Sequence, residues 1–428
     1  MCARIFARAA LAVAIIAPAE AQLPQVQLPQ TPSVQLPPLP DATRAAEAGL
    51  REVAGLRSLR AQQLVRQHRG ELDRDPRGEP VVRAQVIGID MTDVALARAS
   101  RAEFKLLRTE EWRDLGVKVT VLQTPEGMSA SRGLKKLRKL DAQGTYDFNH
   151  LYLDSGTLAA SRGASPADVE IPGAGGAGVR VGLIDGGVDP AHVALRTNVI
   201  HASGCANGVV PSVHGTAVAS LLAGSSDNFR GAAPRAELFA VDVYCGLATG
   251  GAVDRVAAAF AWLASERVAV INVSLVGPRN ALLERVVASL VGRGYLIVAA
   301  VGNDGPAAPP LYPAAYEGVL AVTAVDQKHR VLLEACRGRH VDVAARGADL
   351  LAATRGQPAE FVVVRGTSFA SPRVAGLLAA RLREPDPAAR DRAITALLAG
   401  AEDLGARGRD DIYGAGLVGD GASPLAAQ

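Results

Sequence analysis

The strongest constraint on the fold comes from short apolar segments that alternate with helical segments from Val179 onwards. The helical segments between them, such as 253–264 and 281–294, carry apolar side chains at helical spacing. Apolar strands that alternate with helices indicate a parallel sheet that is covered by helices on both faces. We therefore predict an α/β fold of three layers, with a parallel sheet between helices. The predicted strands are residues 179–185, 237–244, 268–275, 295–302 and 319–326.

Reactive side chains stand where these strands end or where helices begin. Asp185 ends the first strand, His214 opens a helical segment, and Asn303 follows the strand 295–302. Ser368 lies where a Gly-Thr turn leads into another helical segment. Because ligands bind beyond the carboxyl ends of parallel strands, we expect these four side chains to meet at one edge of the sheet.

This set of side chains is the one that acyl transfer by an activated serine requires. His214 would remove the proton of Ser368, and Asp185 would hold the imidazole in the correct tautomer. Asn303 and the backbone N–H of Ser368 would donate to the developing oxyanion. Taken singly, each residue has a structural interpretation, such as a helix cap or a buried histidine. Their occurrence together and in order favours catalysis.

Sequence blocks around these residues resemble those of the subtilisin-like serine proteases. The resemblance extends over about residues 178–420 and ends in DIYGAGLV, which is similar to the closing strand of that family. The chain order Asp, His, Ser is that of subtilisin. A non-catalytic binding protein on this scaffold would lack a member of the set, and serine-carboxyl peptidases replace the histidine with acidic residues. The matching blocks are VGLIDGGVD, HGTAVASLLAG, INVSL, AAVGNDG and GTSFASPRVAG.

The resemblance also implies the residues that bind a peptide substrate. Two edge segments would pair with an extended peptide, as in recognition by strand addition. A further group would border the pocket for P1, the residue before the cleaved bond, and Leu311 would fill its floor, so we expect small or medium apolar P1 residues. The edge residues are Gly250, Gly251, Ser274, Leu275 and Val276, and the pocket residues are Ala300, Gly302 and Leu311.

Residues 80–153 form a second pattern of strands and helices that predicts a small split-βαβ, ferredoxin-like module. It resembles the prodomains of the same family, which assist folding and then inhibit. By this resemblance, the last predicted strand, 145–153, would end in the cleft of the catalytic domain, 179–428. We expect self-cleavage between about His150 and Gly175, within or next to a Gly/Ala-rich junction at 154–178.

The first 21 residues have the features of a signal peptide. Arg4 and Arg8 precede the apolar run Ala9–Ala19, and Ala19-Glu20-Ala21 has the form of a cleavage site. We therefore expect an exported protein, periplasmic or secreted, with no stable membrane span once the signal is removed. Residues 22–79 combine a Pro/Gln-rich linker with a basic helix of unassigned role.

The cysteines and the net charge limit the partners. Cys205 and Cys245 flank the predicted cleft, so we expect them to form a disulfide and Cys336 to be a buried thiol. We expect no cofactor and no metal, because the segment 225–234 is shorter than the calcium-binding loop of several relatives. A formal net charge of +3 gives no reason to expect nucleic acid. The expected partners are protein or peptide substrates and the chain's own prodomain.

Overall fold

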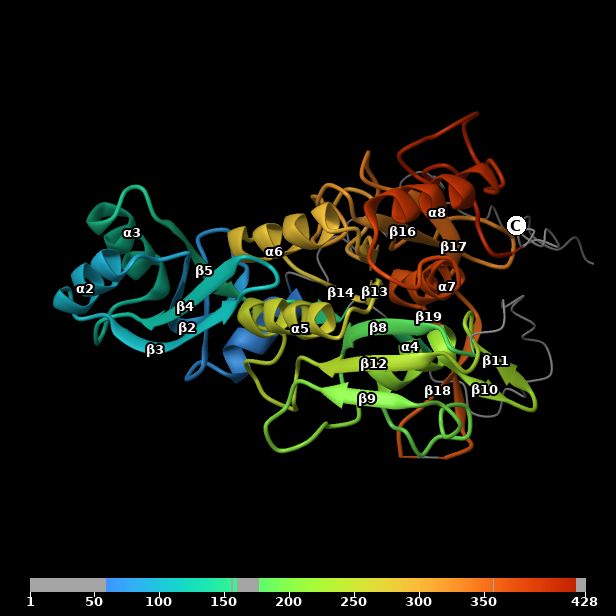
Figure 1. Cartoon of the computed structure of the whole chain (residues 1–428), viewed down its shortest axis with the longest axis horizontal. Helices are drawn as coiled ribbons and strands as arrows, with labels where there is room; N and C mark the ends of the chain where they lie inside the picture. The colour runs from blue at the N-terminus through green and yellow to red at the C-terminus, as the bar shows by residue number, and fades with distance from the viewer. Residues whose placement is uncertain (1–58, 155–156, 160–176, 357, 421–428) are drawn as a thin grey trace, which may run out of the picture. The chain divides into compact units, whose positions relative to one another are not determined.

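The computed structural model describes residues 59–154, 157–159, 177–356 and 358–420. These described residues all belong to one compact unit, and the predicted signal peptide lies outside them. The central element is a parallel sheet of seven strands in the order β17-β16-β15-β13-β8-β12-β9 (Figure 1). Its strands are β8 (Arg180–Asp185), β9 (Ile200–Ser203), β12 (Glu237–Asp242), β13 (Val270–Val273), β15 (Leu296–Ala300), β16 (Leu320–Val325) and β17 (Val343–Arg346).

Helices cover both faces of this sheet. Consecutive residues of a strand point to opposite faces, so neighbouring side chains pack against different helices. In β8, Leu183 packs in the same apolar cluster as residues of α4 (Val213–Ala223), α7 (Thr367–Ala379) and α8 (Pro387–Ala399). Its neighbour Ile184 packs with residues of α5 (Val253–Ser265) and α6 (Ala281–Gly292). Both side chains are fully buried. The predicted three-layer α/β fold is therefore confirmed.

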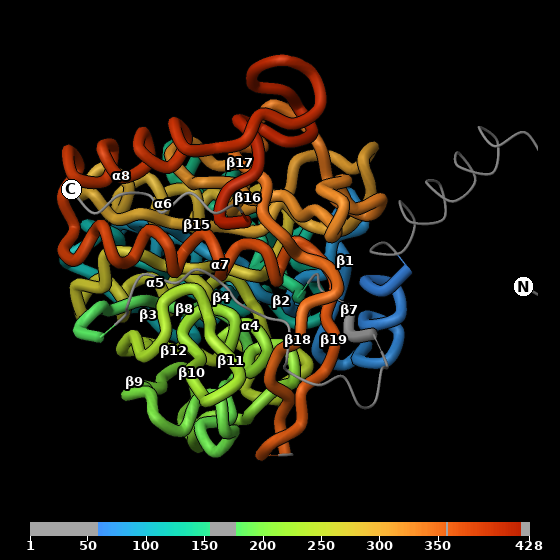
Figure 2. The backbone as a smooth tube through the Cα atoms, turned by 90° about the vertical axis from the view of Figure 1, so that its right-hand side faces the viewer, coloured from blue at the N-terminus to red at the C-terminus, as the bar shows by residue number. Residues whose placement is uncertain are grey.

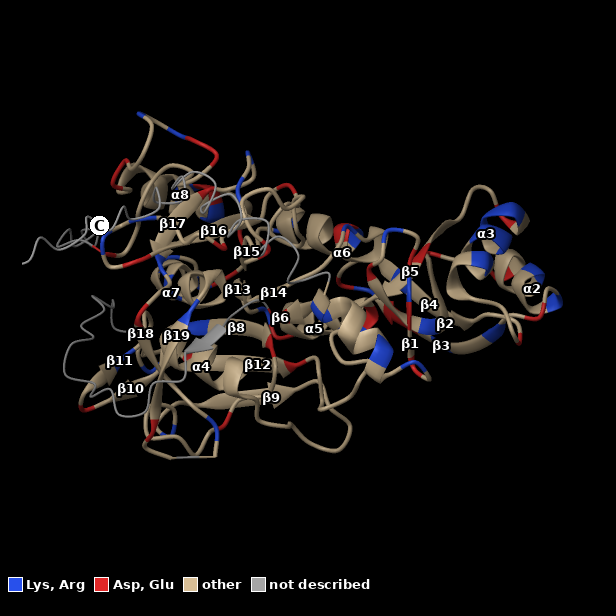
Figure 3. Cartoon of the chain, turned by 180° about the vertical axis from the view of Figure 1, so that it is seen from behind, with Lys and Arg blue, Asp and Glu red and all other residues tan. Residues whose placement is uncertain are grey.

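The N-terminal module is an antiparallel sheet in which β5, β2, β4 and β3 lie side by side in that order. This order is the one that a split-βαβ chain produces. One face packs on α2 and α3, and the other contributes Ile87, Val119 and Val121 to the cluster around α5 and α6. Both α2 and α3 contain Lys or Arg residues, which are blue in Figure 3. The elements are β2 (Pro80–Ile89), α2 (Asp93–Arg101), β3 (Lys105–Trp112), β4 (Val117–Gln123), α3 (Ala130–Leu140) and β5 (Thr145–His150).

The module starts earlier and ends differently from the sequence-based expectation. A strand before residue 80, β1 (Leu72–Arg74), pairs with β2, and helical residues 59–67 precede it. The predicted strand 145–153 divides in two, because β5 pairs with β2 whereas β6 (Leu153–Asp154) pairs with β14 (Leu275–Val276). The chain thus leaves one sheet and joins another within a few residues.

Two further regions differ from what their sequences suggested. The junction 154–178 contains β7 (Thr157–Ala159), which pairs with the free edge of the hairpin β18 (Leu350–Ala353) and β19 (Phe361–Arg365) (Figure 2). Residues 411–418, similar to a closing strand, form only isolated bridges such as Ala344 with Leu417. A short hairpin, β10 (Ser225–Ser226) with β11 (Phe229–Arg230), completes the strands.

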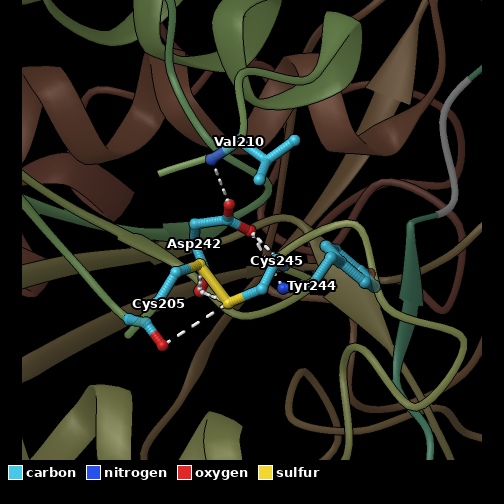
Figure 4. Close-up of a disulfide and its surroundings, with 6 residues drawn as sticks. Cys205, Val210, Asp242, Tyr244 and Cys245 are labelled. Carbon is cyan, nitrogen blue, oxygen red and sulfur yellow. Dashed lines mark hydrogen bonds between the residues drawn. A yellow bond between two sulfur atoms is a disulfide. The ribbon is translucent and has the colours of Figure 1, made fainter. Parts of the chain in front are cut away.

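A disulfide joins Cys205 to Cys245 (Figure 4), as we expected, and Cys336 is buried and lies outside this disulfide. The bridge links the loop after β9 to the loop after β12. Between the two cysteines, the carboxylate of Asp242 accepts hydrogen bonds from the backbone N–H groups of Val210, Tyr244 and Cys245. The bridge and this carboxylate therefore fix two loops at the carboxyl end of the sheet.

We predict that the double substitution Cys205→Ser and Cys245→Ser lowers the free energy of unfolding by about 2–4 kcal/mol, because the bridge restricts a long loop in the unfolded chain. Urea unfolding followed by circular dichroism measures this change. Reductant should lower the midpoint of the wild type and leave that of the double variant unchanged. An unchanged wild-type midpoint in reductant would contradict the prediction.

Candidate active site

Asp185 and His214 form a buried hydrogen-bonded pair at the carboxyl end of the sheet. Asp185 is the last residue of β8 and is 1% exposed, and His214 stands in the first turn of α4 and is 7% exposed. The Nδ1 atom of His214 lies 2.9 Å from Oδ1 of Asp185. The side chain of Ser212 caps α4 by accepting from the N–H of Gly215, which fixes where the helix, and with it His214, begins.

Electrostatics favour a protonated His214. Burial by itself would lower the pKa of His214, but the Asp185 carboxylate raises it above the usual value. Burial raises the pKa of Asp185, whereas the hydrogen bonds from His214 and from the N–H of Gly186 act in the opposite direction. Among the described residues, Nε2 of His214 has no hydrogen-bond partner. This nitrogen is the one that a general base would use.

Ser368 reaches the same place from the other end of the chain. It is fully buried in the first turn of α7, which follows Gly366 in a backbone conformation with φ of 138° that favours glycine. The ring of the next residue, Phe369, lies 5.3 Å from the ring of His214 between centroids. The Ser368 hydroxyl donates to the carbonyl of Ser274 at 3.2 Å.

A proline inside α7 determines how Ser368 is held. Pro372 has no N–H to donate to the carbonyl of the residue four positions earlier, which is Ser368. The hydroxyl of Ser274 donates to this carbonyl instead, at 3.0 Å. Ser274 in turn accepts from the side-chain amide of Asn272 at 2.9 Å. Ser274 therefore fixes both the carbonyl and the hydroxyl of Ser368.

Asn303 is oriented by the turn that begins α7. Its amide oxygen accepts from the N–H of Thr367 at 3.1 Å, and the hydroxyl of Thr367 accepts from the N–H of Gly302 at 3.1 Å. This bond places the side-chain amide of Asn303, whose NH₂ group is a hydrogen-bond donor, beside the N-terminus of α7. Backbone N–H groups at this end of a helix lack partners within the helix. Together they form a set of donors suited to an oxyanion.

The edge residues predicted to bind substrate surround a segment of the chain itself. Tyr152 donates its backbone N–H to the carbonyl of Gly251 at 2.7 Å, and Leu151 forms a bridge with Ala252. On the other side, Leu153 and Asp154 pair with β14, which follows Ser274 directly. Gly250 also requires its hydrogen side chain, since a Cβ would lie 2.5 Å from the carbonyl oxygen of Tyr244.

The expected pocket residues lie beyond β14. A Cβ on Gly302 would lie 2.6 Å from Cδ1 of Leu311, 3.3 Å from the sulfur of Cys336 and 3.6 Å from Cγ1 of Val276. Leu311 is buried and occupies the space beside Gly302. The third expected pocket residue, Ala300, ends β15 and pairs with Val322 in the sheet.

Several residues of this site were missed from the sequence. The ring of Tyr152 lies over Gly277, where a Cβ would come within 2.7 Å of it, and its hydroxyl donates to the carbonyl of Pro278. Tyr244 donates to the carbonyl of Tyr152 at 3.1 Å. In the sequence, only Gly277 could have indicated this contact, because a glycine permits a ring to approach the backbone. Thr367 and Pro372 lay within a recognised block without an assigned role.

Within the described residues, one group of potential metal ligands lies close enough together to hold an ion. It consists of Cys205, Asp242 and Cys245. The two sulfur atoms are joined in the disulfide, and Asp242 accepts backbone hydrogen bonds. This group is therefore structural.

A parallel α/β sheet that gathers Asp, His and Ser at one edge is typical of serine hydrolases. The model of the subtilase family matches residues 176–416, more than half of the chain. The chain belongs to the subtilase family, a family of serine endopeptidases.

Individual relatives agree with this assignment. Subtilisin Savinase from Lederbergia lenta is 34% identical over 248 residues, which cover 57% of this chain and 89% of Savinase. M-protease from Shouchella clausii (strain KSM-K16) is 33% identical over 247 residues, which cover 57% of this chain but 63% of that protein. The chain thus spans less than two thirds of the length of M-protease.

One solved structure resembles a larger part of the chain. Fervidolysin from Fervidobacterium pennivorans, a keratinolytic enzyme related to subtilisin, matches with a TM-score of 0.69. The match covers 81% of this chain and 61% of that chain at 21% identity. It therefore shows a common fold that extends beyond the region matched by the family model.

We predict that peptide hydrolysis is lost on acidification at a higher pH than an ordinary histidine would give. Only neutral His214 can accept the Ser368 proton, and its pKa is raised, so activity falls as pH decreases through that value. The pH profile of kcat/KM measures this. Asp185→Asn should move the midpoint to lower pH and reduce kcat by about 10⁴-fold.

The control for this profile is His201→Gln, since His201 is an exposed histidine on β9 that pairs with Glu237. This variant should keep the wild-type midpoint. A midpoint that shifts with His201 and not with Asp185 would contradict the assignment of the titrating group to His214.

Proposed function

We propose that the protein is an exported serine endopeptidase, made as a self-processing zymogen. The observation that carries the proposal is the buried pair of Asp185 and His214 beside Ser368, with an extended peptide segment seated at the adjoining edges. Asp185, His214 and Ser368 are its triad, and Asn303 is its side-chain oxyanion donor. A non-catalytic binding protein on the same scaffold is the alternative.

We expect these side chains to hydrolyse a peptide bond in two steps, acylation and deacylation. Ser368 Oγ attacks the carbonyl carbon of the scissile bond while His214 Nε2 takes its proton, and Asp185 stabilises the resulting imidazolium. The carbonyl oxygen becomes an oxyanion between Asn303 and the N-terminus of α7. His214 then returns the proton to the leaving amine, and an acyl-enzyme remains. Water, activated in the same way, releases the acid and restores Ser368.

We infer that the N-terminal module is an intramolecular inhibitor. Its chain passes through the cleft as a substrate would, with β6 paired to β14 before the reactive region and β7 paired to β19 after it. Since β19 leads directly into Gly366 and α7, these two pairings bracket Ser368. Self-processing then breaks a bond between Asp154 and Thr157. Residues 155–156, like much of the range His150–Gly175, lie outside the described residues.

Export is supported by two features of different kinds. The first is the signal-like sequence of residues 1–21, which lie outside the described residues. The second is the disulfide, since such bonds persist in oxidising compartments. In the described part of the chain, no helix is long and apolar enough to cross a membrane.

Replacing Ser368 by Ala tests the activity and the processing together. The wild-type chain should react with a fluorophosphonate probe and be cut so that the mature N-terminus is one of residues 155–157. Ser368→Ala should remain unlabelled and full length. Gel fluorescence, intact mass and N-terminal sequencing measure these results.

The matched control is Ser265→Ala, which removes a serine hydroxyl from the end of α5 that bonds only the carbonyl of Trp262. It should behave as the wild type does. A folded wild-type chain that is neither labelled nor cut would favour the binding-protein alternative. Processing of Ser368→Ala at the wild-type rate, without added protease, would exclude self-cleavage.

Leu311 is expected to limit the residue before the cleaved bond to small or medium apolar side chains, because it occupies the space beside Gly302. Cleavage after Ser155 or Gly156 agrees with such a pocket, whereas cleavage after the charged Asp154 would not. Leu311→Gly should raise kcat/KM for peptides with Phe at this position by about 10-fold or more, relative to peptides with Ala there. The removed side chain would leave space for the ring, and apolar groups in a pocket change kcat/KM by about this factor. A wild-type preference for Phe or Arg would contradict this role.

A further inference from the structure

An additional element lies over the cleft from a part of the chain that precedes the module's sheet. Helical residues 59–67 bury Ala61 and pack Leu64 and Val65 against a small apolar cluster. This cluster joins three parts of the molecule: strands of the module, the segment in the cleft, and the start of α5. Its buried members are Leu72, Val82, Leu151, Leu153 and Ala252.

Arg60, on this helical segment, forms hydrogen bonds to two acceptor groups of Asp154, the last described residue of the cleft segment before 155–156. Its guanidinium donates to the backbone carbonyl of Asp154 at 3.0 Å and also to the Asp154 carboxylate. Asp154 is paired on its other side with Leu275 of β14. The residue next to the proposed cleavage region is thus held between the catalytic domain and Arg60.

The helical segment also faces the catalytic pair. A hollow of about 590 Å³ is lined both by Arg60, Leu64 and Asp154 and by Asp185, His214 and Leu247. The charge arrangement is consistent with this position, since the Asp154 carboxylate raises the pKa of His214 and Arg60 opposes that effect. Arg60 therefore balances a second carboxylate near the imidazole.

We propose that helical residues 59–67 form a clamp that retains the cleaved prodomain in the cleft, and that the contact of Arg60 with Asp154 is its central interaction. This inference rests on the proposed self-processing. After the bond is cut, Asp154 lies close to a new chain end, and Arg60 adds a side-chain contact there to the backbone pairings of Tyr152 and β6. The β6–β14 pairing involves only Leu153 and Asp154 on the prodomain side, so a second hold at the same residue slows release.

The clamp predicts that release and cleavage respond differently to Arg60. In the uncut chain, the segment is also held by β7 on the far side, so loss of Arg60 leaves cleavage within about twofold of the wild-type rate. Release after cleavage should become about three- to tenfold faster, the range expected for a partly exposed charged contact. Higher salt should shorten the wild-type lag and leave that of the variant unchanged.

The test follows full-length chains after purification, with cleavage measured by gel and activity by a tetrapeptide p-nitroanilide that has Ala before the anilide. Arg60→Ala should shorten the lag between cleavage and activity, and Arg60→Lys should restore part of it. The matched control is Arg66→Ala, on the same helical segment. An unchanged lag for Arg60→Ala, or an effect on cleavage alone, would overturn the clamp.

A second measurement does not depend on catalysis. In chains that carry Ser368→Ala, amide hydrogen exchange at residues 151–154 should be about three- to tenfold faster with Arg60→Ala than without it, and Asp154→Asn serves if Arg60→Ala fails to fold. If the wild type proves inactive, the proposed function fails, but faster exchange still supports the contact. Equal exchange in the presence and absence of Arg60 overturns the clamp whatever the activity.

Discussion

The site around Ser368 depends on the missing N–H of Pro372, which leaves the Ser368 carbonyl without its partner inside α7. A helix with any other residue there would satisfy the Ser368 carbonyl internally, whereas here the Ser274 hydroxyl does so across the cleft. Ser274 also directly precedes β14, the strand that pairs with β6. One side chain thus joins α7, which carries the proposed nucleophile, to the strand that pairs with Leu153 and Asp154. A displacement of either would be transmitted to the other through this hydrogen bond.

Two aspartates at equivalent positions in the sheet have different partners, because the loops next to them differ. Asp185 and Asp242 are register partners at the ends of β8 and β12. Asp185 meets His214, whereas Asp242 accepts backbone N–H groups from the loops that the disulfide joins. The first carboxylate serves the imidazole and the second builds the wall of the cleft. The sequence blocks predicted the role of Asp185, whereas nothing in the sequence assigned a role to Asp242.

The sequence predicted the inner strands because their side chains are buried on both faces and are therefore apolar throughout. It did not predict the edge strands β9 and β17, whose residues include His201 and Arg346, since an edge strand has fewer buried positions. The break between β5 and β6 and the place of β7 depend on partners in the other domain. The contact of Arg60 with Asp154 joins residues 94 positions apart and leaves no periodic pattern in the sequence. Long-range contacts of this kind need the folded chain.

The pairing of β6 with β14 and of β7 with β19 has a consequence for folding as well as for catalysis. A peptide-binding edge offers unpaired backbone groups to any extended chain, so it is also a template for aggregation. In this structure the edges of β14 and β19 are already covered by the chain's own strands β6 and β7. A newly made molecule therefore presents no open edge at its cleft to its neighbours. Under the proposed self-processing, the same backbone groups become available for foreign peptides only after the fold that surrounds them is complete.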